Sequence, residues 1–113
     1  MKKISPYVYA GLNTKKVTFS KIQKVICSHF KVDFSDIESK SRERKFVIPR
    51  QLIAYFCKIY LDETLAEIGN LVNRDHSTVL NSIKVINNYN ETLKGFSDIV
   101  GDLNSKIVGG NDD

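Results

Sequence analysis

The sequence predicts an all-α fold, a small helical domain of five to six helices that contains a helix-turn-helix. Apolar residues recur at three- and four-residue spacing through most of the chain after Thr18. No segment alternates apolar and polar residues over a useful length, so no strand is predicted. The chain has 113 residues, of which 42% are hydrophobic, and this is enough for one domain with its own core.

We place the domain at residues 18–108. Residues 1–17 lack an apolar period and contain Pro6 and Gly11, so we predict a flexible N-terminal arm. Residues 109–113 begin with two glycines and end in polar residues, so we predict a disordered tail.

The first predicted helix begins after Thr18, whose side chain can cap it, and carries Phe19, Ile22, Val25 and Ile26 at helical spacing. A short amphipathic turn follows over Asp33–Ser39. Residues 40–45 form a charged loop without an apolar side chain. We predict that Pro49 occupies the first position of the next helix, because its fixed φ suits that position. This helix reaches Tyr60 and turns five residues inward, namely Leu52, Ile53, Phe56, Ile59 and Tyr60.

A capping box opens the following helix, because Thr64 and Glu67 can each accept the other's backbone amide. The helix is short, since Asn73 follows soon after and tolerates the left-handed conformation of a tight turn. Asp75 or a neighbour caps a further helix with Val79, Leu80, Ile83, Ile86 and Tyr89 on its faces. A last helix uses Leu93, Phe96, Ile99, Val100, Leu103 and Ile107.

The two segments Thr64–Leu71 and Asp75–Tyr89, joined by a tight turn, are typical of a helix-turn-helix. The second opens on five successive polar side chains, Arg74-Asp75-His76-Ser77-Thr78. Such groups at a helix end suit the major groove of DNA, where each base pair presents its own donors, acceptors and methyl groups. The alternative is local, with Asp75 as a helix cap and both hydroxyls solvated. The residues alone leave both interpretations open.

Charge is unevenly distributed along the chain. Residues 15–60 carry a net charge of +7, whereas residues 61–113 carry −5. A basic half favours a polyanionic partner, and the alternative is a solvated surface with chance clustering.

Several classes of function find no support in the sequence. No apolar stretch approaches the roughly 20 residues of a membrane span, and the basic start is not a signal peptide. Cys27 and Cys57 are isolated on apolar helical faces, which fits core packing in a reducing cytosol. His29 is best explained by packing beside Phe30. We therefore predict no enzyme, no catalytic residue, no metal and no cofactor, in a cytoplasmic, nucleoid-associated protein.

Four segments together carry a resemblance to a known family: Ser39-Lys40-Ser41-Arg42, Pro49-Arg50-Gln51, Glu67-Ile68-Gly69 and Arg74-Asp75-His76-Ser77-Thr78-Val79-Leu80. In order and spacing they resemble the C-terminal DNA-binding domain of the bacterial replication initiator DnaA family, over roughly residues 18–107. The resemblance implies that the partner is double-stranded DNA. It also implies sequence-specific binding at an A/T-rich site, in replication initiation or its control.

The resemblance implies a role for each matching residue. Arg42, in the charged loop, corresponds to the arginine that enters the minor groove, and elementary electrostatics agrees, because narrow A/T-rich minor grooves attract arginine. Base edges in the major groove are read by Arg74, Asp75, His76, Ser77, Thr78 and Asn81. The DNA backbone is contacted by Lys40, Arg50, Gln51, Lys58 and the amides at Leu65 and Ala66.

The sequence also departs from the family pattern. Only Asn73 separates Val72 from Arg74, where two glycines are usual, and Ser77 and Asn81 replace threonine and histidine. The chain contains no phosphate-binding loop of an ATPase domain. This absence fits either a fragment of a longer initiator or a free-standing DNA-reading module of the kind that suits a mobile element. Because the first sixteen residues, from Met1, do not resemble the family, we expect the free-standing module.

Two other functions remain open. A transcription regulator of a mobile element would use the same DNA chemistry. A protein-interaction module acting on replication proteins would use Tyr7, Tyr9 and the last helix. No heptad pattern is present, so we expect a monomer on a non-palindromic site.

Overall fold

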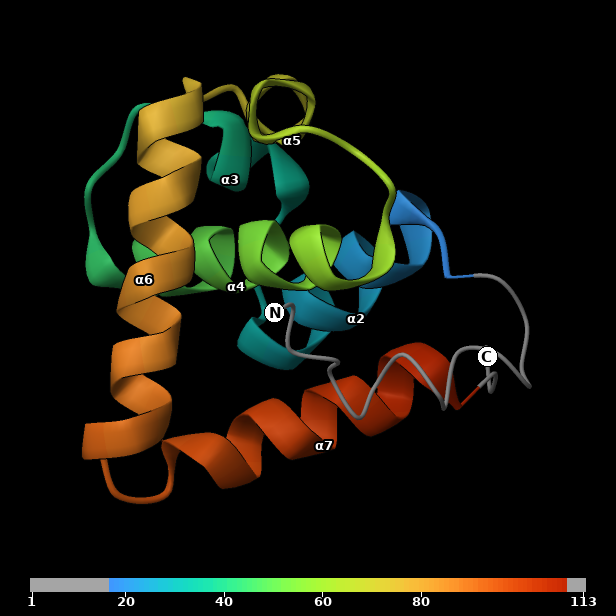
Figure 1. Ribbon diagram of the computed structural model, residues 1–113, viewed down its shortest axis with the longest axis vertical. Coiled ribbons are helices and arrows are strands. Elements are labelled where there is room, and N and C mark those ends of the chain that lie inside the picture. Colours follow the sequence, from blue (N-terminus) through green and yellow to red (C-terminus); the bar gives the residue numbers. More distant parts are fainter. Residues whose placement is uncertain (1–16, 110–113) are drawn as a thin grey trace, which may run out of the picture.

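The computed structural model describes residues 17–109, which form α-helices and no strand (Figure 1). The all-α prediction of five to six helices is therefore confirmed for this part of the chain. The predicted arm, apart from Val17, and the tail beyond Gly109 lie outside the described residues. The helices are α2 (Phe19–Phe30), α3 (Phe34–Glu38), α4 (Arg44–Tyr60), α5 (Leu65–Val72), α6 (His76–Thr92) and α7 (Phe96–Val108).

Helix α4 is the centre of the fold, and α2, α3, α5 and α6 all pack against it. Figure 1 shows α6 crossing in front of α4, and α7 running below them. Of the predicted inward residues of α4, Leu52, Ile53 and Phe56 are fully buried, and Ile59 and Tyr60 are partly buried against the core. Val17 is also buried, so the packed structure includes a residue that precedes α2.

The apolar pattern was less accurate in the last two helices. Val79 and Ile86 are buried, but Leu80 is 41% exposed. Leu93, predicted to belong to the last helix, instead follows the end of α6 and is 51% exposed. Ile99 lies on α7 and is 40% exposed, because α7 buries the face that carries its other four predicted core residues, Phe96, Val100, Leu103 and Ile107.

The predicted helix starts are confirmed at three places. The Thr18 side chain accepts the amide of Lys21. Thr64 and Glu67 form the reciprocal capping box at the start of α5. The Asp75 carboxylate accepts the amide of Thr78 at 2.9 Å. These caps depend on residues three positions apart, so the local sequence determines them.

The predicted position of Pro49 is wrong. Pro49 lies inside α4, which begins at Arg44, so Arg44 and Lys45 are helical rather than part of the charged loop. Proline costs the helix one hydrogen bond, since it has no amide for the carbonyl four residues earlier. Ile48 packs against the core and Pro49 is buried, and this tertiary packing supports the additional turn.

The turn between α5 and α6 is tight. Asn73 ends α5 with φ of 60° and ψ of 46°, the left-handed conformation that was predicted. A Cβ at Gly69 would collide with the backbone carbonyl oxygen of Arg74 and lie 3.2 Å from its carbonyl carbon. Helix α5 therefore packs directly on the turn that leads into α6, and only glycine permits this approach.

Gly69→Ala should lower the free energy of unfolding by about 1–3 kcal/mol, because the backbone of the turn must shift to make room. Gly101→Ala in α7 is the matched control, since nothing lies within 4 Å of the position that its new methyl group would occupy. That change should raise stability by up to about 1 kcal/mol through helix propensity. Urea denaturation measures both variants, and equal effects would contradict the close approach at Gly69.

Candidate nucleic-acid interface

The start of α6 presents polar side chains to solvent. His76, Ser77, Thr78 and Asn81 are all exposed there, and Asp75 precedes them as the helix cap. Oδ1 of Asp75 accepts from the amide of Thr78 at 2.9 Å and from the Ser77 hydroxyl at 3.1 Å. These hydrogen bonds lower the pKa of Asp75, so its carboxylate is ionised at neutral pH. The capping interpretation of Asp75 is therefore correct, and it leaves the side chain exposed.

The loop between α3 and α4 lies beside this helix start and comprises Lys40–Glu43, which we call the basic loop. Lys40 and Arg42 are exposed. Two serines shape the loop, since the hydroxyl of Ser39 accepts the Ser41 amide and the hydroxyl of Ser41 accepts the Glu43 amide, both at 3.2 Å. Local side-chain bonds of this kind fix an irregular backbone.

Arg50, for which the resemblance implies a phosphate contact, lines the cleft beside the basic loop but is mostly buried. Its side chain points into the protein and the residue is 6% exposed. Nε donates to the carbonyl of Ile37 at 2.6 Å, and Nη2 donates to the carbonyls of Asp36 at 3.2 Å and Ser39 at 3.4 Å. Arg50 therefore bonds three carbonyls at the C-terminal end of α3, of which that of Asp36 also accepts from the amide and the hydroxyl of Ser39.

Arg74, predicted to read base edges, is also hydrogen-bonded within the protein. It precedes α6 and is partly buried, and Nη2 donates to the carbonyl of Ser39. Nη1 donates to the carbonyls of Asn73 at 2.8 Å and Val72 at 3.5 Å. Its guanidinium is thus hydrogen-bonded to backbone carbonyls and is not extended beside the polar start of α6.

Asn73 has a role that the sequence analysis missed. Its side-chain amide donates to the carbonyl of Glu38 at 3.0 Å, across 35 residues of sequence. With Arg50 and Arg74, it completes a set of donors to four successive carbonyls, those of Asp36, Ile37, Glu38 and Ser39, which we call the α3 carbonyl cluster. The signal available in the sequence was that α3 ends without a glycine cap, so its carbonyls need distant donors.

A cleft of about 290 Å³ lies between the basic loop and the turn of the helix-turn-helix. It is lined by four cationic and two neutral polar residues, namely Lys40, Ser41, Arg42, Arg50, Asn73 and Arg74. Burial and the nearby charge of Arg74 lower the pKa of Arg50. Among the described residues no carboxylate lines the cleft, so its positive charge favours an anion.

The remaining predicted backbone contacts lie on α4 and α5. Gln51 is partly buried and Lys58 is exposed. The capping box uses the amides of Thr64 and Glu67, which leaves those of Leu65 and Ala66 at the helix start.

Three carboxylates surround the start of α5, those of Asp62, Glu63 and Glu67. Partial burial raises the pKa of Glu63, and Glu67 and Asp62 raise it further. The amide of Thr64 lowers the pKa of Glu67. This negative charge opposes the attraction that a helix start exerts on a phosphate.

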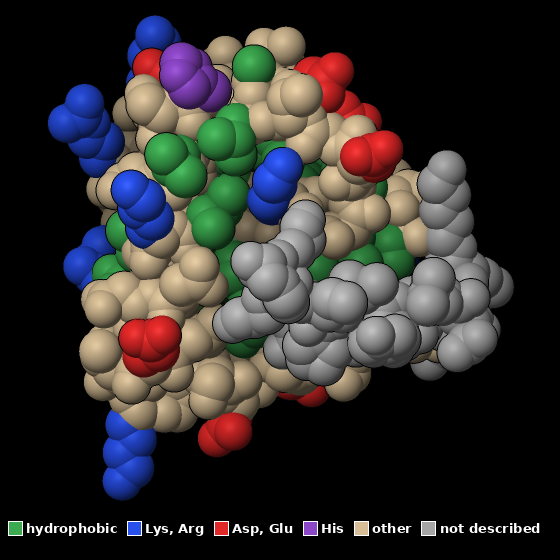
Figure 2. Space-filling view, viewed as in Figure 1, with side chains coloured by type: hydrophobic (Ala, Val, Ile, Leu, Met, Phe, Trp, Pro, Cys, Tyr) green, Lys and Arg blue, Asp and Glu red, His purple; other side chains and the backbone are tan. Residues whose placement is uncertain are grey.

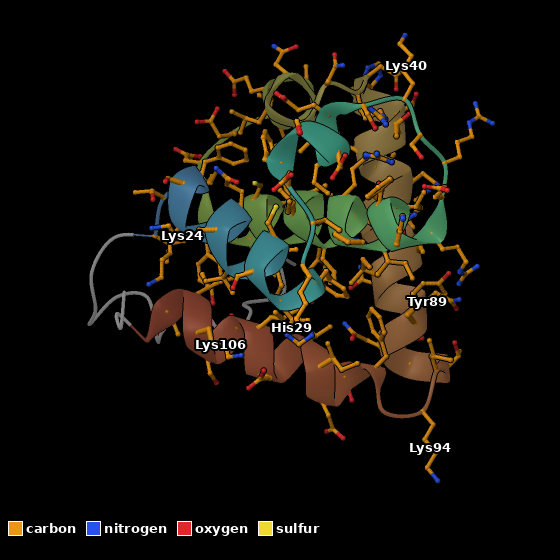
Figure 3. The ribbon with its side chains drawn as sticks, turned by 180° about the vertical axis from the view of Figure 1, so that it is seen from behind. Lys24, His29, Lys40, Tyr89, Lys94 and Lys106 are labelled. Carbon is orange, nitrogen blue, oxygen red and sulfur yellow. The ribbon has the colours of Figure 1, made fainter. Side chains whose placement is uncertain are left out.

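Basic and acidic side chains also gather in different places on the face of the molecule that Figure 2 shows. Figure 2 shows lysine and arginine side chains along the edge beside α6 and the start of α4, and acidic side chains near the α4–α5 connection. In Figure 3, Lys40 points outward at the end of the molecule where α6 begins, whereas Lys94 lies at the opposite end, at the α6–α7 connection. None of the helices within residues 17–109 is long and apolar enough to cross a membrane.

The family described as "Bacterial dnaA protein helix-turn-helix" matches residues 19–86, from α2 into α6. The chain belongs to this family. Proteins named "Chromosomal replication initiator protein DnaA" are similar to it over most of its length. The one from Flavobacterium psychrophilum is 39% identical over 94 residues, which is 82% of this chain and 20% of that protein.

Two further DnaA proteins show the same coverage. The protein from Bacteroides thetaiotaomicron is 40% identical over 83% of this chain and 20% of its own length. The protein from Spiroplasma citri is 35% identical over 86% of this chain and 22% of its own length. The chain thus spans about a fifth of the DnaA proteins that it matches.

Arg50→Ala should lower the free energy of unfolding by about 3 kcal/mol in the absence of any partner, because three carbonyls lose a charged donor. Lys58→Ala removes the same charge from an exposed position and should change stability by less than about 0.5 kcal/mol. Urea denaturation at neutral pH measures both. If the two variants were equally stable, Arg50 would not hold α3 in place.

Proposed function

We propose that this chain binds double-stranded DNA sequence-specifically as a monomer, with α6 in the major groove and Arg42 in the minor groove. One observation carries the proposal. The exposed Arg42 lines a cleft together with Asn73 and Arg74 of the turn that leads into the polar start of α6, and its lining within residues 17–109 includes four cations and no carboxylate. The name shared by the similar DnaA proteins supports a role in replication initiation or its control.

The start of α6 supplies groups that can read base edges. Ser77 and Asn81 are one helical turn apart and share a face, and His76 opens the helix. An asparagine amide pairs with the edge of adenine, and hydroxyl and imidazole groups both donate and accept. Asp75 uses one oxygen for the helix cap, and its other oxygen can accept from the amino group of cytosine.

The basic loop can recognise DNA in a different way, through the minor groove. Arg42 is exposed on a loop rather than a helix, so it can enter a narrow minor groove, where A/T-rich DNA concentrates negative potential. Lys40 and the cations of the cleft attract the phosphates between the two grooves without regard to sequence. We therefore expect an A/T-rich segment at the end of the site that faces the loop.

Selection of bound duplexes from a random pool identifies the site, and a competition series then changes each base pair in turn at fixed salt. Arg42→Ala should relax A/T preference at one end only, whereas His76→Ala should relax preference at the other positions. Each lost contact should be worth about 1–3 kcal/mol of discrimination. Affinity should fall steeply as salt rises.

Lys94→Ala is the control, because it removes one charge at the far end of α6 and should leave the base preferences unchanged. If selection returned no preferred sequence and affinity were insensitive to salt, the chain would not be a sequence-specific DNA-binding protein. A uniform loss across all sequences in Arg42→Ala would make Arg42 a phosphate contact only.

Removal of a carboxylate at the start of α5 should raise the affinity for DNA, in contrast to the losses expected above. Glu63→Gln removes a carboxylate from the residue that precedes the Thr64 cap of α5, so a phosphate at this helix start should bind more tightly. We expect a gain in affinity of about two- to five-fold at low salt, which shrinks as salt rises. Glu91→Gln at the other end of α6 is the control, and equal gains in both variants would exclude a phosphate contact at α5.

A further inference from the structure

We propose that Arg50, Asn73 and Arg74 are positioning residues that couple minor-groove reading to major-groove reading through the α3 carbonyl cluster. The proposal rests on the proposed function and deepens it, since it assigns specificity to residues that touch no base. It starts from the observation that one short helix end is held from two directions. Arg50 holds it from α4, and Asn73 and Arg74 hold it from the turn of the helix-turn-helix.

The basic loop begins directly after Ser39, the last residue of the α3 carbonyl cluster. The carbonyl of Ser39 accepts from Arg50 and from Arg74, and Arg42 is three residues further along the chain. Three residues reach at most about 10–11 Å, so fixing Ser39 confines the backbone of Arg42 to a small volume. The serine bonds within the loop confine it further. Arg42 is therefore held at a defined place relative to α6.

Helix α3 cannot hold this place by itself. It has five residues, and isolated helices of that length are unstable in water. Its C-cap, Ser39, is extended with φ of −72° and ψ of 172°, so the last carbonyls are not closed by a left-handed residue. Cationic donors at this end also match the negative end of the helix dipole. The position of α3 thus depends on side chains from α4 and from the turn.

Asn73 makes the most specific connection. The left-handed backbone at this position suits glycine equally well, so the side-chain amide is what asparagine adds. That amide bonds the carbonyl of Glu38, the last residue of α3. The turn residue that sets the direction of α6 is thus bonded directly to the helix that carries the basic loop. We therefore expect a shift of α6 on DNA to move the basic loop, and a shift of the basic loop to move α6.

Asn73→Gly tests the coupling, because it keeps the turn conformation and removes only the amide. Although Asn73 lies in the helix-turn-helix, the variant should lose about three- to ten-fold of the A/T discrimination at the end read by Arg42, the equivalent of about one hydrogen bond. Arg74→Lys keeps the charge, loses the planar fork and should have the same effect. At those positions, Asn73→Gly should add nothing to Arg42→Ala, since both act through one side chain.

Lys31→Gly is the matched control, because Lys31 is the other non-glycine residue with positive φ within residues 17–109 and it ends α2. It should leave the base preferences unchanged. The proposal is overturned if Asn73→Gly keeps full A/T discrimination in a protein that selects a site, or if its effect adds fully to that of Arg42→Ala.

A measurement without DNA separates this inference from the proposed function. Backbone amide order parameters for Lys40–Glu43 should be near about 0.85 in the unchanged chain and should fall towards about 0.6 in Asn73→Gly and Arg74→Lys. A fall supports the mechanical link even if no DNA sequence is selected, in which case the proposed function fails alone. Unchanged order parameters in both variants overturn the link, whatever the DNA results.

Discussion

The capping of the α3 carbonyl cluster is the interaction on which the rest of the candidate site depends. Four carbonyls at the end of a five-residue helix accept hydrogen bonds from the distant side chains of Arg50, Asn73 and Arg74, and that of Asp36 also accepts from Ser39. Because these donors come from α4 and from the turn before α6, one cluster joins three parts of the fold. Without it, the basic loop would be tied to the recognition helix only through the core of the domain.

Under the proposed function, this arrangement separates the residues that position the site from those that we propose read DNA. Two arginines that would be strong DNA contacts if exposed are instead committed to backbone carbonyls. Arg42 and the start of α6 are left exposed, and the bonds behind them restrict their freedom before any partner binds. Preorganisation of this kind reduces the entropy lost on binding. The carboxylates at the start of α5 oppose the attraction of a phosphate to the other side of the helix-turn-helix.

Most of the fold could be predicted because it is decided locally. The caps at Thr18, Thr64 and Asp75, and the left-handed Asn73, depend on residues close together in sequence. Pro49 was misplaced because packing overrides the local preference of proline for a helix start. The directions of Arg50 and Arg74 could not be inferred, since their carbonyl partners lie up to 35 residues away and no pattern marks them. The sequence thus did not indicate which of the predicted site residues face outward, nor that Asn73 bonds to Glu38.

The distance between the basic loop and α6 tests the central claim most directly. Spin labels at Arg42→Cys and Asn81→Cys would report it by pulsed electron resonance in the free protein, since Cys27 and Cys57 are buried. Burial raises the pKa of Cys57 to about 12, so its thiol stays unreactive. We predict a single narrow distance distribution in the labelled chain that broadens clearly when Asn73→Gly and Arg74→Lys are added. An equally narrow distribution in both would contradict the account, because the loop would then be positioned without the α3 carbonyl cluster.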